Sequence, residues 1–169
     1  FDELVSNQKT DFSRYNYFYA KYLESLNKNE KSKKIINQAL KLYPRNLLLN
    51  QHKADLKNQN SNLNFSCKKE EHVAAEIIYI AANALSSQSI FPLSNFYLNL
   101  AKYLNKEFHT FDTLLAENFF KIEDYSTSKI IYKRLSKNGD ALEWFSQKQI
   151  SRILILEENV NQSIKLFSK

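Results

Sequence analysis

The sequence predicts an all-α fold, a right-handed α-solenoid of helical hairpins. Apolar residues recur three and four positions apart along most of the 169-residue chain, the spacing of amphipathic helices. Glycine occurs once and proline twice, so the glycine-rich turns of all-β folds and of nucleotide-binding loops are not expected. Small side chains also return at a regular interval, which indicates a repeat.

The first part of the chain predicts three helices, each with a recognisable boundary. Asp11 or Ser13 can cap the first helix. Pro44 ends the second, because the residue before a proline disfavours helical geometry. The third helix is entered from Asn46. These helices are expected over residues 13–26, 32–43 and 47–57, and residues 1–6 are interpreted as the end of a preceding helix.

The rest of the chain predicts six further helices. Glu70 and Glu71 place acidic side chains at the positive end of a helix dipole. Pro92 suits the first turn of a helix, where its missing N–H costs least. The clearest turn surrounds Gly139. The helices are expected over residues 70–87, 92–104, 109–122, 125–136, 141–156 and 160–167.

Residues 58–69 are polar, rich in Asn and Ser, and the least periodic stretch of the chain. They are the only candidate for an internal domain boundary. The residues before them would bury their apolar face poorly on their own, so we predict a single solenoid over residues 1–169.

Four hairpins share one pattern of small residues. Two small side chains lie 12 positions apart in each hairpin, and adjacent hairpins repeat every 34 or 35 residues. The pairs are Ala20 and Ser32, Ala82 and Ser94, Ala116 and Ser128, and Ser151 and Ser163. Only 62 residues separate Ala20 from Ala82, where two full repeats need about 68. We therefore expect an irregular, shortened repeat at about 47–69.

These features resemble the tetratricopeptide repeat (TPR) family. SKKIINQALKLYPRN, residues 32–46, is similar to the family's second helix and terminal proline, and EDYSTSKIIYKRL, residues 123–135, is similar to its turn and second helix. More narrowly, residues 75–167 resemble bacterial, in particular alphaproteobacterial, TPR proteins of poorly defined role. The chain departs from the family where Ala or Ser replaces its first small glycine and where the final proline appears only as Pro44. The resemblance implies a protein-binding scaffold.

The resemblance also implies a binding surface. In such solenoids the first helix of each hairpin lines the concave face, and the positions three before and one after its small residue point into the groove. Exposed aromatic rings there would suit a peptide, whereas ordinary solvent-facing positions are the alternative reading. Applied here, the rule gives eight residues, and Glu24 and Phe120 join them one helical turn further on. The full set is Tyr17, Lys21, Glu24, Tyr79, Asn83, Thr113, Glu117, Phe120, Lys148 and Arg152. Of these positions, we favour the face of Tyr79 and Asn83 as the contact with a partner.

Residues with catalytic or ligating chemistry are scattered. The three histidines lie far apart, and Cys67, the single cysteine, can form no intrachain disulfide. We expect no catalytic residues, no bound metal and no cofactor, so the chain is not predicted to be an enzyme. Trp144 is interpreted as a packing residue between hairpins.

The net charge of +6 is uneven. Residues 1–68 hold 12 Lys and Arg against six Asp and Glu, whereas residues 69–169 are balanced. The excess is densest at Lys28, Lys31, Lys33 and Lys34. A solvated face is the plainer reading, and an acidic partner, a membrane surface or nucleic acid is the functional one. Aromatic residues do not alternate with these lysines as a single-strand stacking surface requires, so nucleic acid is a minor alternative.

The predicted function is a scaffold that binds a peptide or helix of another protein in its concave groove. A structural segment of a larger cell-envelope or assembly protein is the alternative. The chain has no run of about 18 apolar residues that could span a membrane. Because it begins at Phe1 rather than Met, we interpret it as a piece of a longer protein, of the cytoplasm or the periplasm.

Overall fold

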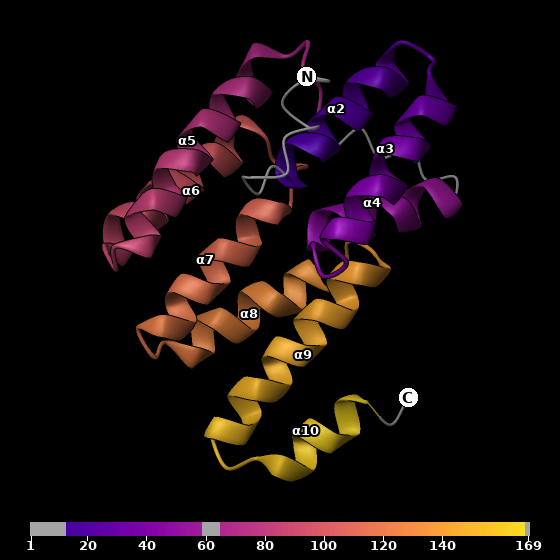
Figure 1. The fold of residues 1–169 in the computed structure, drawn as a ribbon. Coiled ribbons are helices and arrows are strands. Elements are labelled where there is room, and N and C mark those ends of the chain that lie inside the picture. Colours follow the sequence, from indigo (N-terminus) through magenta and orange to yellow (C-terminus); the bar gives the residue numbers. More distant parts are fainter. Residues whose placement is uncertain (1–12, 59–64, 168–169) are drawn as a thin grey trace. The chain divides into compact units, whose positions relative to one another are not determined.

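The computed structural model describes residues 13–58 and 65–167, and the regular structure within them is helical throughout (Figure 1). The predicted all-α class is therefore confirmed. The predicted helix end at 1–6 lies outside the described residues. The helices are α2 (Ser13–Ser25), α3 (Asn29–Leu42), α4 (Leu47–Lys57), α5 (Glu70–Ser87), α6 (Phe91–Leu104), α7 (Thr110–Lys121), α8 (Tyr125–Leu135), α9 (Asp140–Leu156) and α10 (Val160–Leu166).

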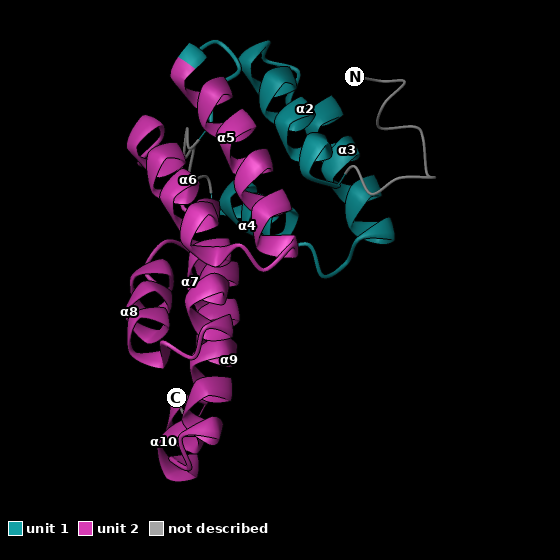
Figure 2. Cartoon of the chain, turned by 90° about the vertical axis from the view of Figure 1, so that its left-hand side faces the viewer, with its two compact units in different colours: residues 1–70 teal, residues 71–169 magenta. Residues whose placement is uncertain are grey.

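The chain divides into two compact units, residues 1–70 and residues 71–169, which Figure 2 colours separately. The division falls at the end of the aperiodic stretch 58–69, the position that the sequence marks as the candidate boundary. The single solenoid over residues 1–169, with its shortened repeat at about 47–69, stays a prediction.

The first unit packs three helices around an aromatic and aliphatic core. α2 packs on α3, and α4 packs on both. The ring of Phe18 lies 4.3 Å from that of Phe65, measured between centroids. Asn46 caps α4 as predicted, because its side chain accepts a hydrogen bond from the backbone N–H of Leu49 at 3.0 Å. The same side chain donates to Ser13 Oγ at 2.8 Å and so ties α4 to α2.

The second unit runs through successive neighbouring helices. α6 packs on α7, α7 on α8, α8 on α9, and α9 on α10. The hydroxyl of Ser94 donates to the backbone carbonyl of Ala82 at 2.8 Å, which joins α6 to α5. The unit's fully buried side chains include Leu98, Phe111, Tyr132, Leu135 and Ile153.

The four predicted hairpins share one turn geometry. In each, the residue seven positions after the first small residue has a positive φ between 57° and 63°. The next backbone N–H then donates to the carbonyl five residues earlier at 2.8–2.9 Å, which closes the end of the first helix. The positive-φ residues are Asn27, Ser89, Glu123 and Glu158. The repeat found in the sequence therefore has a common local structure.

The small positions are buried as the pattern requires. At the first small position Ala20, Ala82 and Ala116 are fully buried and Ser151 is 8% exposed, and the four serines at the second small position are 0–5% exposed. The hydroxyl of Ser128 donates to the carbonyl of Ala116 at 2.9 Å, the same bond that Ser94 makes to Ala82. Small side chains thus let the paired helices approach closely while their hydroxyl groups remain satisfied.

Most predicted helix boundaries lie within one or two residues of those observed, with one larger difference. α3 begins at Asn29 rather than at residue 32. Its turn is already complete at Asn27, whose left-handed backbone reverses the chain, so the helix can begin two residues later. Glu30 then lies in the first turn, where a negative charge is favourable.

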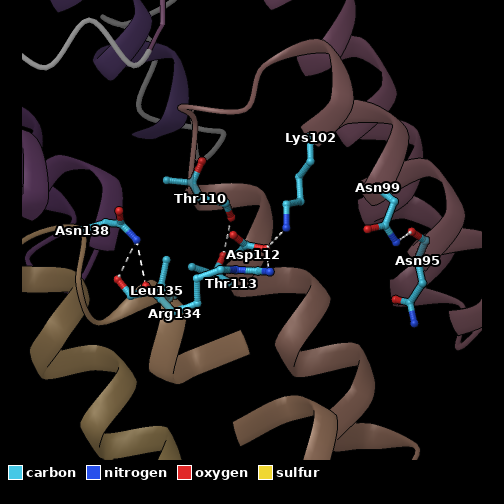
Figure 3. A network of polar contacts seen from close by, with 9 residues as sticks. All are labelled: Asn95, Asn99, Lys102, Thr110, Asp112, Thr113, Arg134, Leu135 and Asn138. Atoms are coloured by element: carbon cyan, nitrogen blue, oxygen red, sulfur yellow. Dashed lines mark hydrogen bonds and ion pairs between the residues drawn. The ribbon is translucent and has the colours of Figure 1, made fainter. Parts of the chain in front are cut away.

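A buried carboxylate connects three helices of the second unit. Asp112 of α7 is 2% exposed and forms ion pairs with Lys102 of α6 and, at 2.9 Å, with Nη2 of Arg134 of α8 (Figure 3). Two cations compensate for the cost of removing this carboxylate from water. The contact fixes the relative positions of α6, α7 and α8.

Candidate partner-binding groove

A hollow of about 380 Å³ opens between α7 and α9 in the second unit. Three of the residues that the sequence assigns to a groove line it, namely Phe120, Lys148 and Arg152. Ser151, Ile155 and Leu156 complete the lining. The two helices therefore present their predicted groove positions to the same space.

Arg152 lines this hollow and connects α9 to α7. Its guanidinium carbon is 3.8 Å from the centroid of the Phe120 ring, which is cation–π geometry. Its Nη1 atom is 3.9 Å from Oε1 of Glu117, a long ion pair on a half-exposed side chain. Glu117 and Phe120 lie one helical turn apart on α7, so one turn positions both partners of the arginine.

Glu117 also contacts Tyr132 of α8. The phenol of Tyr132 donates to Oε2 of Glu117 at 3.4 Å. Burial raises the pKa of Tyr132 above its ordinary value, and the neighbouring Glu117 carboxylate raises it further. The phenol therefore stays protonated and neutral at physiological pH and serves as a hydrogen-bond donor to the carboxylate.

The floor and rim of the groove differ in chemistry. Ile155 and Leu156 are each 54% exposed, and Phe120 adds aromatic surface. Lys148 at the rim places its ammonium 5.6 Å from the ring centroid of Trp144. Apolar surface beside two cations can accept an aliphatic or aromatic side chain together with a carboxylate. The hollow offers no grouping that would activate a nucleophile.

The other predicted residues of the second unit lie along α5 and α7. The ring of Tyr79 lies 5.4 Å from that of Phe111, so the tyrosine packs partly against α7. Asn83 is exposed. Thr113 is half-buried and donates its hydroxyl to the backbone carbonyl of Thr110 at 2.6 Å. The role of these residues in partner binding stays a prediction.

The predicted groove residues of the first unit lie elsewhere. Tyr17 is 3% exposed and Lys21 is 9% exposed, so the expectation of an exposed aromatic at Tyr17 is wrong. The cause is α4, which covers this face of α2 and places the ring of His52 5.2 Å from that of Tyr17. In this unit the groove positions form part of the core.

Glu24 is the polar centre of that core. Its carboxylate accepts hydrogen bonds from Lys21 at 2.9 Å and from Ser32 at 2.8 Å, and pairs with His52 Nε2 at 2.8 Å. Burial alone would raise the pKa of Glu24, but the hydrogen bonds and charges of His52 and Lys21 outweigh it and lower this pKa to about 2. Glu24 thus stays ionised and joins α2, α3 and α4.

Three further residues differ from the sequence-based expectation. Trp144 is 61% exposed rather than packed between hairpins, so that interpretation is wrong. Ile155 and Leu156 were not predicted as groove residues. They follow Arg152 by three and four positions on the same helix, so extending the predicted face by one turn would have found them.

The described residues contain neither a metal-ligand cluster nor a membrane-spanning helix. Across residues 13–58 and 65–167, His, Cys, Asp and Glu side chains do not gather in groups of three that could hold a metal ion. None of the helices in this part of the chain combines the length and apolar content needed to cross a bilayer.

No protein-family model, curated protein or solved structure matches the chain.

Proposed function

We propose that this protein is a non-enzymatic interaction scaffold that binds a peptide or helix of a partner protein in the groove between α7 and α9. The observation that carries the proposal is the common hollow formed by Phe120, Lys148 and Arg152. The positional rule taken from the family resemblance gives Lys148 and Arg152 directly and Phe120 one turn further on, and the hollow has the size and mixed chemistry of a side-chain pocket. A right-handed solenoid of TPR-like hairpins is the architecture that we propose with it.

The exposed apolar surface of the groove supports a protein ligand. Ile155 and Leu156 lie one helical turn after the cationic Arg152 on α9. A peptide in the groove would therefore bury their exposed aliphatic surface next to a charged group. Interfaces between proteins combine apolar centres with aromatic and arginine side chains in this way. A small polar substrate would leave the apolar floor uncovered.

The proposal can be tested by selecting peptides from a random display library with the whole chain. Enriched peptides are then measured against Arg152→Glu and Phe120→Ala, with Lys133→Glu on the exposed face of α8 as the charge-matched control. We expect the two groove variants to weaken binding about tenfold or more, because each removes a central contact. The proposal fails if no peptide is enriched, or if every enriched peptide binds the groove variants and the control alike.

A further inference from the structure

A second hollow, of about 280 Å³, lies between α3 and α4 of the first unit. Each helix contributes three residues at positions i, i+3 and i+4, which lie on one face of a helix. The lining residues are Lys33, Ile36 and Asn37 of α3, and Lys53, Leu56 and Lys57 of α4. The two faces therefore meet across one groove.

The charge of this region is strongly positive. Residues 29–57 contain seven Lys and Arg against two Asp and Glu, a net charge of +5. Both acidic residues already have partners, since Glu30 pairs with Lys33 at 2.9 Å and Asp55 accepts from Gln51 at 2.8 Å. Among the described residues, no carboxylate lies within ion-pair distance of Lys53 or Lys57. The groove thus presents uncompensated ammonium groups.

The floor of the groove is apolar. Leu56 is half-buried and leaves aliphatic surface open in the hollow, whereas Ile36 is 1% exposed and closes it on the α3 side. A nucleic acid backbone would use the charges but not this floor, and the lining contains no aromatic ring on which a base could stack. A protein segment with carboxylates on either side of an aliphatic side chain would use both.

We propose that the α3–α4 groove is a second binding site, which takes an acidic amphipathic segment of a partner protein. Aspartate or glutamate side chains of the segment pair with Lys53 and Lys57, and an aliphatic side chain covers Leu56. The site belongs to the first unit and is independent of the α7–α9 groove, so it goes beyond the function proposed above.

The test uses the whole chain and a fluorescein-labelled synthetic helical peptide. The peptide carries Leu at every third or fourth position with Glu between them, and a control peptide carries Gln in place of every Glu. Binding is followed by fluorescence anisotropy at low and high salt. The variants are Lys53→Glu with Lys57→Glu, Leu56→Ser, and the charge-matched control Lys34→Glu with Lys41→Glu on exposed positions of α3. Circular dichroism establishes that each variant keeps its helices.

We expect the glutamate peptide to bind and the glutamine peptide to bind at least about tenfold more weakly, with the difference reduced at high salt. The K53E/K57E variant should lose about tenfold in affinity and the K34E/K41E variant less than about threefold, because only the former removes the groove's cations. Leu56→Ser should also weaken binding.

Three results would overturn the proposal. The first is no detectable binding of the glutamate peptide by the folded wild-type chain. The second is an equal loss of affinity in K53E/K57E and K34E/K41E, which would mean attraction to net charge alone. The third is a single-stranded RNA oligonucleotide that binds more tightly than the peptide and depends on the same lysines.

Discussion

Nε2 of His52 lies 2.8 Å from Oε1 of Glu24, and this contact joins α4 to α2 in the first unit. Ser32 of α3 donates to the same oxygen of Glu24 at 2.8 Å, so donors on all three helices converge on one carboxylate. A half-buried carboxylate with several charge-assisted hydrogen bonds contributes to stability only while it is ionised.

The first prediction concerns acid. The pKa of Glu24 is lowered to about 2 in the folded chain, below its ordinary value of 4.5. A lowered pKa means that the contribution to stability is present above pH 4.5 and is lost as the pH falls through 4.5 towards 2. We expect Glu24→Gln to lower the free energy of unfolding at neutral pH by about 1–3 kcal/mol. Urea denaturation followed by circular dichroism across this pH range measures both effects.

The control for this experiment is Glu30→Gln, because the Glu30 side chain is 89% exposed and pairs only with Lys33 on its own helix. It should change the free energy of unfolding by less than about 0.5 kcal/mol. The prediction is contradicted if Glu24→Gln loses stability between pH 4.5 and 2 as steeply as the wild-type chain.

The second prediction concerns Asp112, which bridges Lys102 and Arg134. Asp112→Asn removes the charge of a side chain that is 3% exposed. The side chain of Arg134 is 53% exposed, so its guanidinium can be hydrated once the ion pair is lost. We expect a loss of about 2 kcal/mol in the free energy of unfolding, less than for a fully buried pair. Chemical denaturation is the measurement. Glu157→Gln, which breaks the more exposed pair with Lys129, should lower the free energy of unfolding by less than about 1 kcal/mol. If Glu157→Gln costs as much as Asp112→Asn, burial of Asp112 does not explain its contribution.

The third prediction concerns the shared turn. Glu123 and Glu158 have φ values of 63° and 62°, a region in which a side chain is strained and glycine is not. We expect Glu123→Gly and Glu158→Gly each to stabilise the chain by about 0.5–1 kcal/mol, after the greater flexibility of glycine in the unfolded chain is subtracted. Asn27→Gly should gain less, since asparagine tolerates this conformation. A larger gain at Asn27 than at Glu123 in thermal denaturation would refute the explanation.

Local structure was predictable from the sequence because it depends on nearby residues. The 12-residue spacing from Ala82 to Ser94 predicts that both residues lie in one helical hairpin, and the Ser94 hydroxyl donates to the Ala82 carbonyl across that hairpin. The cap at Asn46 and the start of α5 at Glu70 also follow from local chemistry. The aperiodic stretch 58–69 marks where a boundary could fall, but whether the chain forms two units there depends on how whole helices pack, which local spacing does not report.

Part of the predicted groove set is brought together where the repeat is regular. On α7 and α9, Phe120, Lys148 and Arg152 line one hollow, and their role in binding stays a prediction. In the first unit the same register fails for Tyr17, because α4 covers the predicted face and His52 packs on the ring. No local spacing in α2 reports where a later helix will pack, so burial of that face was not predictable.

The last prediction uses Trp144, the only tryptophan of the chain, as a reporter for the α7–α9 groove. Its ring is 61% exposed, and the ammonium of Lys148, which lines the groove, lies 5.6 Å from its centroid. We expect the fluorescence of the folded chain to resemble that of a water-exposed indole. A peptide bound in the groove should shift the emission to shorter wavelength, because it excludes water and draws Lys148 away from the ring.

Two variants show which site produces the signal. Arg152→Glu should abolish the shift, since it reverses the central charge of the α7–α9 groove, whereas K53E/K57E should keep it, since those lysines line the other hollow. Loss of the shift in K53E/K57E, or a full shift in Arg152→Glu, would contradict the prediction. Because one tryptophan gives the whole signal, Trp144→Phe supplies the blank, and any remaining change belongs to the peptide itself.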